Sequence, residues 1–289
     1  EETYEVVRVT TGAINNEGKS IIGNINSVGD LTIYMTIEDS TNSRNGLFWN
    51  SFIRTYNGRL AFTGYCVDTV SSLVFGIADI NLDSVAVFKY NNPLADAFRG
   101  HSILKYDGNS YYITGVITIE SLNKAHVALI KVDSNGSRQW ERHYNQYKID
   151  QANTIIKLNN GNMMLGAVRN NADLDPIERA NTWLLEVDTG GNLVRQWFDS
   201  NDSTYEADGL LPPPDGGFIY GTEKKHSQSF SSVYKTALIV KLDSNFNKVW
   251  MFSGGIAGSN TGFKDVEISG NNYIACGNYS NSQAWIVKL

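Results

Sequence analysis

The amino-acid sequence predicts an all-β fold, and two observations carry the prediction. The first is a series of Asn-Gly and Asp-Gly pairs set between runs of β-forming residues, which begin at Asn57, Asp107, Asn160 and Asp215. Tight hairpin turns need residues that tolerate a positive φ, so such pairs are the strongest short-range signal for a β-hairpin. The second is a turn motif that ends in tryptophan and recurs along the chain, while patterns typical of helices are essentially absent.

The tryptophan motif recurs at an even spacing. It occupies residues 132–140, 187–197 and 242–250, with weaker copies upstream. Its last residue, or an apolar counterpart, lies at positions 33, 88, 140, 197 and 250, so successive copies are 55, 52, 57 and 53 residues apart. A period near 50 that holds several short strands is typical of a β-propeller or a related repeat array.

Each repeat contains two predicted hairpins and therefore four strands, which we name A to D. Strands A and B flank the Asn-Gly or Asp-Gly turn, and B ends on a glycine; strands C and D flank the tryptophan motif. Strand C is almost wholly apolar over 127–130, 183–185 and 237–240, as expected of an inner strand buried on both faces. The aspartate that opens the C–D turn is expected to accept hydrogen bonds from backbone amides two residues on. Four such strands form one propeller blade.

The two ends of the chain fit the repeat less well. The last repeat supplies strands A, B and C, with C at 284–289, and lacks D. Residues 4–9 can fill that edge and close the ring, which removes exposed strand edges that invite aggregation. We therefore predict one propeller domain over 1–289, with atypical closing strands in 1–46 and repeated blades in 47–289. The strand count favours six blades, with five as the alternative.

The repeat resembles one that is common in exported and cell-surface proteins of prokaryotes, roughly DGGYI…KhDxxGxxxW with h apolar. The segments that carry the resemblance are 215–219, 237–243 and 248–250. It extends from about residue 48 to residue 289 and more loosely over 18–37. The resemblance implies a propeller module of a secreted or surface protein and implies no particular activity.

Composition excludes some classes of function. The net charge of −6 argues against a nucleic-acid partner, since such proteins need a clustered basic surface. The sequence has no run of 18 apolar residues, so we predict no membrane span. Only 19% of the residues are charged, and Asn, Ser, Thr and Tyr are abundant. This composition favours a secreted or cell-surface location.

Two groups of polar residues are candidates for a binding site. The A–B and C–D turns are nearly identical between repeats, whereas the B–C loops differ, and one of them, residues 223–234, carries His226 and Tyr234. Binding residues tend to lie on irregular loops held by a rigid scaffold. The second group lies near the starts of the A strands, where polar side chains are expected to converge on a central channel: Asn50, Arg99, His101, Asn153, Asp208 and Asp265.

One acidic loop suggests a cation. Asp173, Asp175 and Glu178 lie within six residues of one another, and Ca²⁺ prefers oxygen ligands of this kind. The spacing differs from that of an EF-hand, and an acidic loop exposed to solvent is the alternative interpretation. No other cofactor is expected.

These observations lead to a functional hypothesis with two alternatives. The contrast between a regular scaffold and variable loops predicts a non-catalytic extracellular binding or adhesion module for a glycan or protein surface. The first alternative is a propeller enzyme, a hydrolase or lyase acting on glycans through the central carboxylates and His101. The second is a structural subunit of a surface assembly, including a homo-oligomer.

Overall fold

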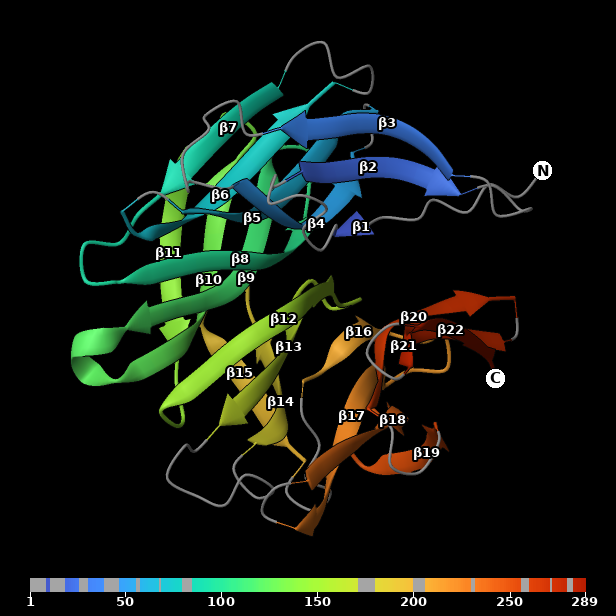
Figure 1. Ribbon diagram of the computed structural model, residues 1–289. Coiled ribbons are helices and arrows are strands. Elements are labelled where there is room, and N and C mark those ends of the chain that lie inside the picture. The colour runs from blue at the N-terminus through green and yellow to red at the C-terminus, as the bar shows by residue number, and fades with distance from the viewer. Residues whose placement is uncertain are drawn as a thin grey trace. The chain divides into compact units, whose positions relative to one another are not determined.

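The chain is all-β in the computed structural model (Figure 1). One 3₁₀ turn, Glu120–Leu122, is the sole helical element of the described residues, and no helix among them is long and apolar enough to span a membrane. The structure describes residues 9–10, 19–25, 31–38, 47–55, 58–67, 69–79, 85–170, 180–199, 206–229, 232–255, 260–270, 272–279 and 283–289.

The chain divides into two compact units. The first comprises Glu1–Asn123 and Ala128–Arg142, and the second comprises Lys124–Val127 and His143–Leu289. We describe each unit by itself.

The strands of the first unit form three groups whose members pair in antiparallel fashion. An N-terminal sheet of three strands contains β1 (Val9–Thr10), β2 (Lys19–Ile25) and β3 (Leu31–Glu38). The next two groups each have four strands in the order A to D: β4 (Leu47–Arg54), β5 (Leu60–Val67), β6 (Ser71–Ala78) and β7 (Val85–Tyr90), then β8 (Ala97–Lys105), β9 (Ser110–Ile119), β10 (Lys124–Asp133) and β11 (Arg138–Tyr144). A parallel pair, Ser71 with Ala97, joins β6 of the second group to β8 of the third.

The second unit repeats the same order of strands. Its two four-stranded groups are β12 (Ile149–Lys157), β13 (Met163–Asn170), β14 (Ala180–Val187) and β15 (Leu193–Phe198), then β16 (Asp208–Leu211), β17 (Phe218–Ser229), β18 (Ser232–Leu242) and β19 (Lys248–Gly254). A sheet of three strands follows, with β20 (Thr261–Ser269), β21 (Asn272–Tyr279) and β22 (Gln283–Lys288).

These sheets confirm the predicted blades. Four groups have the A-to-D order of antiparallel strands, and the last sheet has A, B and C, as the sequence predicted. The hairpin expected over 18–37 is β2 paired with β3. Of the segment expected to close the ring, residues 4–8 lie outside the described part of the chain, and Val9 pairs with Ile21 in β2. Ring closure and the number of blades stay predictions.

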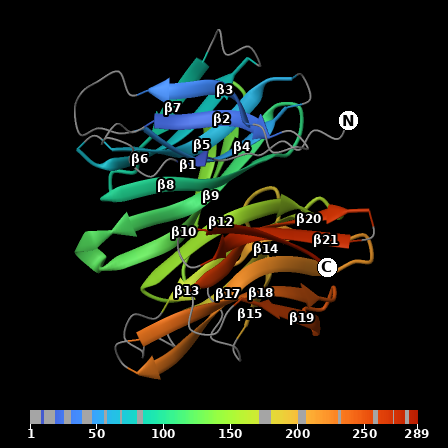
Figure 2. The ribbon, with the colours of Figure 1, turned by 45° about the vertical axis from the view of Figure 1, so that its right-hand side comes forward.

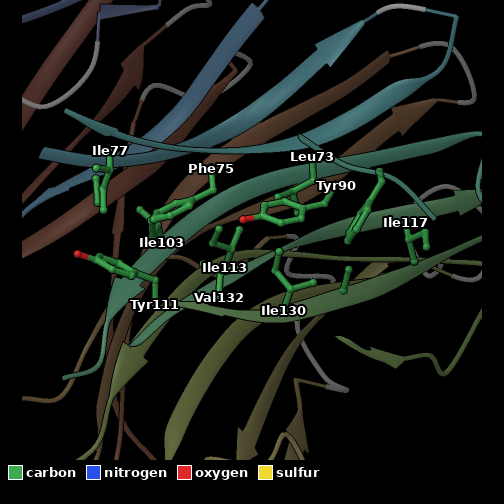
Figure 3. Packing of buried hydrophobic residues seen from close by; sticks show 13 residues of the cluster. Leu73, Phe75, Ile77, Tyr90, Ile103, Tyr111, Ile113, Ile117, Ile130 and Val132 are labelled. Atoms are coloured by element: carbon green, nitrogen blue, oxygen red, sulfur yellow. The ribbon is translucent and has the colours of Figure 1, made fainter. Parts of the chain in front are cut away.

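Apolar side chains between successive sheets form the cores. In the first unit, Leu73, Phe75 and Ile77 of β6 pack with Ile113 of β9 and Ile130 of β10 (Figure 3). In the second unit, one core joins the faces of the β12–β15 and β16–β19 sheets, and another joins the β16–β19 and β20–β22 sheets. Every side chain of the predicted C-strand segments 127–130, 183–185 and 237–240 is buried, as expected of inner strands.

The turn chemistry is also as predicted. Asp133 Oδ1 accepts hydrogen bonds from the amides of Asn135 and Ser137, both at 2.9 Å. Asp188 and Asp243 make the equivalent pair of bonds in the later repeats. Side-chain acceptors of this kind hold a turn closed by satisfying its amides.

A β-bulge or comparable register shift interrupts each of the five A strands that follow β3. The shifts lie between Trp49 and Ser51, Gly100 and Ser102, Ala152 and Thr154, Asp208 and Leu211, and Phe263 and Asp265. A bulge leaves one residue unpaired and turns its side chain away from the regular alternation. Four of the unpaired residues are Asn50, His101, Asn153 and Lys264.

The bulges explain the glycines of strand B. A Cβ added to Gly64 would lie 1.8 Å from Phe48 O, and one added to Gly115 would lie 1.9 Å from Arg99 O. At Gly277 the obstacle is Gly262 O, again at 1.9 Å. In each case a carbonyl of the distorted A strand occupies the space of a side chain, so only glycine fits opposite it.

Candidate active site

In the second unit β16, β17 and β20 contact one another (Figure 1), and Figure 2 shows β17 and β20 from a second direction. A cluster of charged residues lies on these strands. Its centre is Lys264, the unpaired residue of the β20 bulge. Lys264 Nζ lies 2.9 Å from Asp208 Oδ2 and 3.7 Å from Glu206 Oε2. Asp208 is the first residue of β16 and Glu206 lies two residues before it, so one ammonium group contacts two acids at the beginning of the neighbouring A strand.

Amide side chains of β12 hold the same two carboxylates from the other side. Gln151 Nε2 donates to Glu206 Oε1 at 3.0 Å, and Asn153 Nδ2 donates to Asp208 Oδ1 at 3.2 Å. Asp208 therefore has one oxygen on Asn153 and the other on Lys264. Its position is fixed by the A strands of two neighbouring sheets.

A third carboxylate, Glu223 of β17, borders the cluster. It is 5% exposed and forms an ion pair with Lys235 of β18. A Cβ added to Gly262 would lie 2.9 Å from Glu223 Oε2, so the carboxylate sits directly against the start of β20. Its charge contributes to raising the pKa of Glu206.

Asp265 follows Lys264 and keeps an accessible side chain. Desolvation by the surrounding protein, followed by the negative charges of Glu267 and Asp208, raises the pKa of Asp265 to about 6. The Val266 amide donates to Asp265 Oδ1 at 2.9 Å and opposes part of this shift. Burial and the charge of Asp208 likewise raise the pKa of Glu206.

Lys264 shows the opposite balance. Burial alone would lower the pKa of its ammonium group, but the carboxylates of Asp208, Glu206 and Glu223 raise it well above its ordinary value. The group stays a cation at every physiological pH. The site thus combines a fixed positive charge, a carboxylate bound to it, and an accessible carboxyl group that holds a proton close to neutral pH.

Three of the residues predicted for the channel come together here: Asn153, Asp208 and Asp265. The other three lie in the first unit. Asn50 Nδ2 donates to Gly100 O at 2.7 Å, which places it beside Arg99 and His101, and the Arg99 guanidinium lies 4.9 Å from the centre of the Tyr65 ring.

His226 and Tyr234 are also close to each other, with stacked rings whose centres are 4.7 Å apart. They are paired residues of the long β17–β18 hairpin, so the segment expected to be an irregular loop is largely strand. Burial and the charge of Lys224 lower the pKa of His226. Asp173, Asp175 and Glu178 lie outside the described residues, and within the described part no group of three His, Cys, Asp or Glu side chains is arranged to hold a metal ion.

The sequence did not single out Glu206, Glu223 or Lys264. The signal for Lys264 was its place two residues after Gly262, which corresponds to the place of Asn50 after Phe48 and of His101 after Arg99. It becomes visible only when the repeats are aligned on the bulge.

Comparison of the structure with solved structures identifies the architecture. An endo-arabinase from Bacteroides thetaiotaomicron VPI-5482 superposes with a TM-score of 0.51 and 10% identity, over 82% of this chain and 91% of the arabinase. The chain has a β-propeller fold. No family model and no curated protein sequence matches it.

Two further propeller structures similar to this one are also hydrolases. A thermostable family-43 glycoside hydrolase has a TM-score of 0.50 and 12% identity, over 82% of this chain and 88% of the hydrolase. Sucrose-6-phosphate hydrolase from Lactobacillus gasseri has a TM-score of 0.50 and 10% identity, over 93% of this chain and 60% of that enzyme. The expectation of a non-catalytic binding module is therefore wrong, because the propellers that this chain resembles are glycoside hydrolases.

Proposed function

We propose that this propeller hydrolyses glycosidic bonds, with Asp265 as general acid and Asp208 as the ionised carboxylate. The observation that carries the proposal is the contrast between these two neighbouring groups. Asp265 has a pKa of about 6 and an accessible side chain, whereas Asp208 lies 2.9 Å from the Lys264 ammonium. Glycosidases commonly rely on two carboxyl groups whose surroundings keep one protonated and the other ionised.

The chemistry follows from those two states. Asp265 donates its proton to the glycosidic oxygen as the bond between that oxygen and the anomeric carbon breaks. A water molecule attacks the anomeric carbon and gives a proton to Asp208, which has lone pairs beyond those used by Asn153 and Lys264. The negative charge of Asp208 also stabilises the positive charge that develops on the sugar ring.

The fold of the similar enzymes supports the reaction class, and the composition rich in Asn, Ser and Thr favours an extracellular glycan as substrate.

The test is release of reducing sugar from arabinan and sucrose, together with cleavage of a panel of p-nitrophenyl glycosides. We expect activity on at least one substrate and its loss in Asp265→Asn and Asp208→Asn. Asp79→Asn is the matched control, since it makes the same change at an exposed ion pair with Arg59, 3.1 Å away. Full activity in both Asp265→Asn and Asp208→Asn, on a substrate that the parent protein cleaves, would overturn the assignment.

A further inference from the structure

The bulge of β20 places a lysine where the bulges of β4, β8 and β12 place neutral residues or a histidine. The corresponding residues are Asn50, His101 and Asn153. Asn50 and Asn153 donate hydrogen bonds toward the next A strand, to Gly100 O and to Asp208 Oδ1. Lys264 reaches the preceding A strand instead, and brings a charge to Asp208 Oδ2. The β-bulge that elsewhere positions a neutral or histidine side chain thus places the Lys264 ammonium group beside the Asp208 carboxylate.

The surroundings of Lys264 are strongly acidic. Three carboxylates act on Lys264: Glu206, which precedes β16, Asp208 of β16 and Glu223 of β17. Asp265 and Glu267 follow Lys264 on β20, and Lys235 of β18 is paired with Glu223. Carboxylates this close to one another repel, and without a compensating cation some of them take up protons.

We propose that Lys264 is a positioning residue: its ammonium group, together with the Asn153 amide, holds the Asp208 carboxylate in place beside Asp265 and supplies the positive charge of the cluster. This inference rests on the proposed glycosidase function for its catalytic meaning. The electrostatic part stands on the geometry alone: Lys264 Nζ is 2.9 Å from Asp208 and 3.7 Å from Glu206, while Asn153 fixes the opposite oxygen of Asp208.

The positive charge of Lys264 has a specific kinetic consequence. The proposed reaction uses a carboxylate that lies next to the Lys264 ammonium, so removal of this charge should affect the acid limb of the kcat/KM profile. Loss of an opposite charge at hydrogen-bond distance raises a carboxyl pKa, and does so less where solvent screens the pair; the Lys264 side chain is 49% exposed. The acid limb of Lys264→Ala should therefore move to higher pH by on the order of 1 unit, while a purely structural role for Lys264 would lower activity equally at every pH.

The experiment compares K264A, K264R and K288M. Arginine keeps the charge and should restore the position of the acid limb. Lys288 lies on β22 of the same sheet and is exposed, so K288M makes the same change of net charge outside the cluster and should leave the limb where it is. Propylammonium ions added to K264A should return part of the lost activity, which supports a role for the charge itself.

A readout without substrate separates this inference from the proposed function. Titration of the Asp and Glu carboxyl carbons by ¹³C NMR should show two carboxyl groups with pKa values on the order of 1 unit higher in K264A than in the parent protein. If that shift appears and no glycan is cleaved, the glycosidase proposal fails and the role of Lys264 as the cation of the cluster stands. If the carboxyl titrations of K264A and the parent coincide, the inference about Lys264 is wrong even if the enzyme is active. Should K264A fail to fold, K264Q, which keeps a donor for Asp208, takes its place in both measurements.

Discussion

The two units of this chain use one backbone design and differ in what it displays. In the first unit the bulged A strands present Asn50 and His101, and the contact between neighbouring A strands is a neutral hydrogen bond to Gly100 O. In the second unit they present Asn153 and Lys264, and the neighbouring contacts are made to carboxylates. The bulge is therefore a feature of the fold that both units share. The chemical difference between the units comes from the few side chains at the unpaired positions.

The largest effect expected from this comparison is on catalysis. Asp265→Asn should reduce kcat/KM by about 10² to 10⁴, the usual contribution of general acid catalysis. His101→Ala, in the first unit, should reduce it far less, because the proposed acid and base, Asp265 and Asp208, both lie in the second unit. Steady-state assays on the best substrate of the panel measure both. Equal losses in the two variants would break the distinction between the units.

The second effect is on stability and should be the same in both units. Gly115→Ala and Gly277→Ala each direct a Cβ onto a carbonyl 1.9 Å away, so we expect a loss of about 1 to 3 kcal/mol or more. Gly108→Ala is the control, since an added Cβ there meets nothing within 4 Å. Urea unfolding of the three variants measures the difference. If Gly115→Ala lowers the free energy of unfolding and Gly277→Ala does not, the requirement for glycine opposite the bulge is not shared by the two units.

A third prediction concerns the stability of the second unit as pH changes. The pKa of Asp265 is raised from 3.8 to about 6 on folding, so between these values the folded state binds more protons than the unfolded state. Its contribution to stability is therefore present at low pH and is lost as pH rises through this window. Asp265→Asn removes the unfavourable charge and should stabilise the protein at pH 7 by on the order of 1 kcal/mol, after allowance for solvent screening of an accessible group.

Thermal unfolding of Asp265→Asn and the parent protein at pH 4 and pH 7 measures this effect. The variant should have the higher Tm at pH 7, by roughly 2 to 4 °C, and the gap should narrow at pH 4. A variant that is less stable at pH 7 would contradict the raised pKa. A more stable but inactive variant would also show that its loss of activity does not arise from misfolding.

The smallest expected effect is a shift of the pH profile. Glu267 contributes to the raised pKa of Asp265, so Glu267→Gln should lower that pKa. If Asp265 acts as the general acid, the alkaline limb of kcat/KM then moves to lower pH by less than about one unit, with little change at the optimum. An alkaline limb that does not move would place the acid elsewhere.

Much of the fold was predictable because it depends on local chemistry. Asn-Gly and Asp-Gly turns, an aspartate that caps each C–D turn, and wholly apolar C strands specify hairpins without reference to distant residues. Closure of the ring through residues 4–9 stays a prediction, because it would require pairing with a strand far away in the sequence, which local chemistry does not specify. The resemblance to a repeat of exported proteins, likewise, stays a prediction about origin.

The site was only partly predictable, and the bulges explain why. Corresponding positions in the repeats led to Asp208 and Asp265, but the extra residue in β20 changes the phase of the strand and turns Lys264 toward the carboxylates. Glu206 and Glu223 precede or lie outside the A strands, so no alignment of A strands could include them. The prediction of a non-catalytic binding module was wrong for a related reason. It was based on the variable B–C loops, whereas charged residues such as Asp208 and Lys264 lie on the A strands.

The glycine opposite each bulge has a consequence for how such a chain changes over time. Gly64, Gly115 and Gly277 leave room for the carbonyl groups of the bulged strands. The identity of the unpaired residue in each bulge is therefore not needed to form the bulge. A single substitution at that residue can introduce, remove or reverse a charge while the main chain stays as it is. The bulges therefore provide equivalent positions in successive blades, and a reactive side chain can move from one of these positions to another by substitution, without a change of fold.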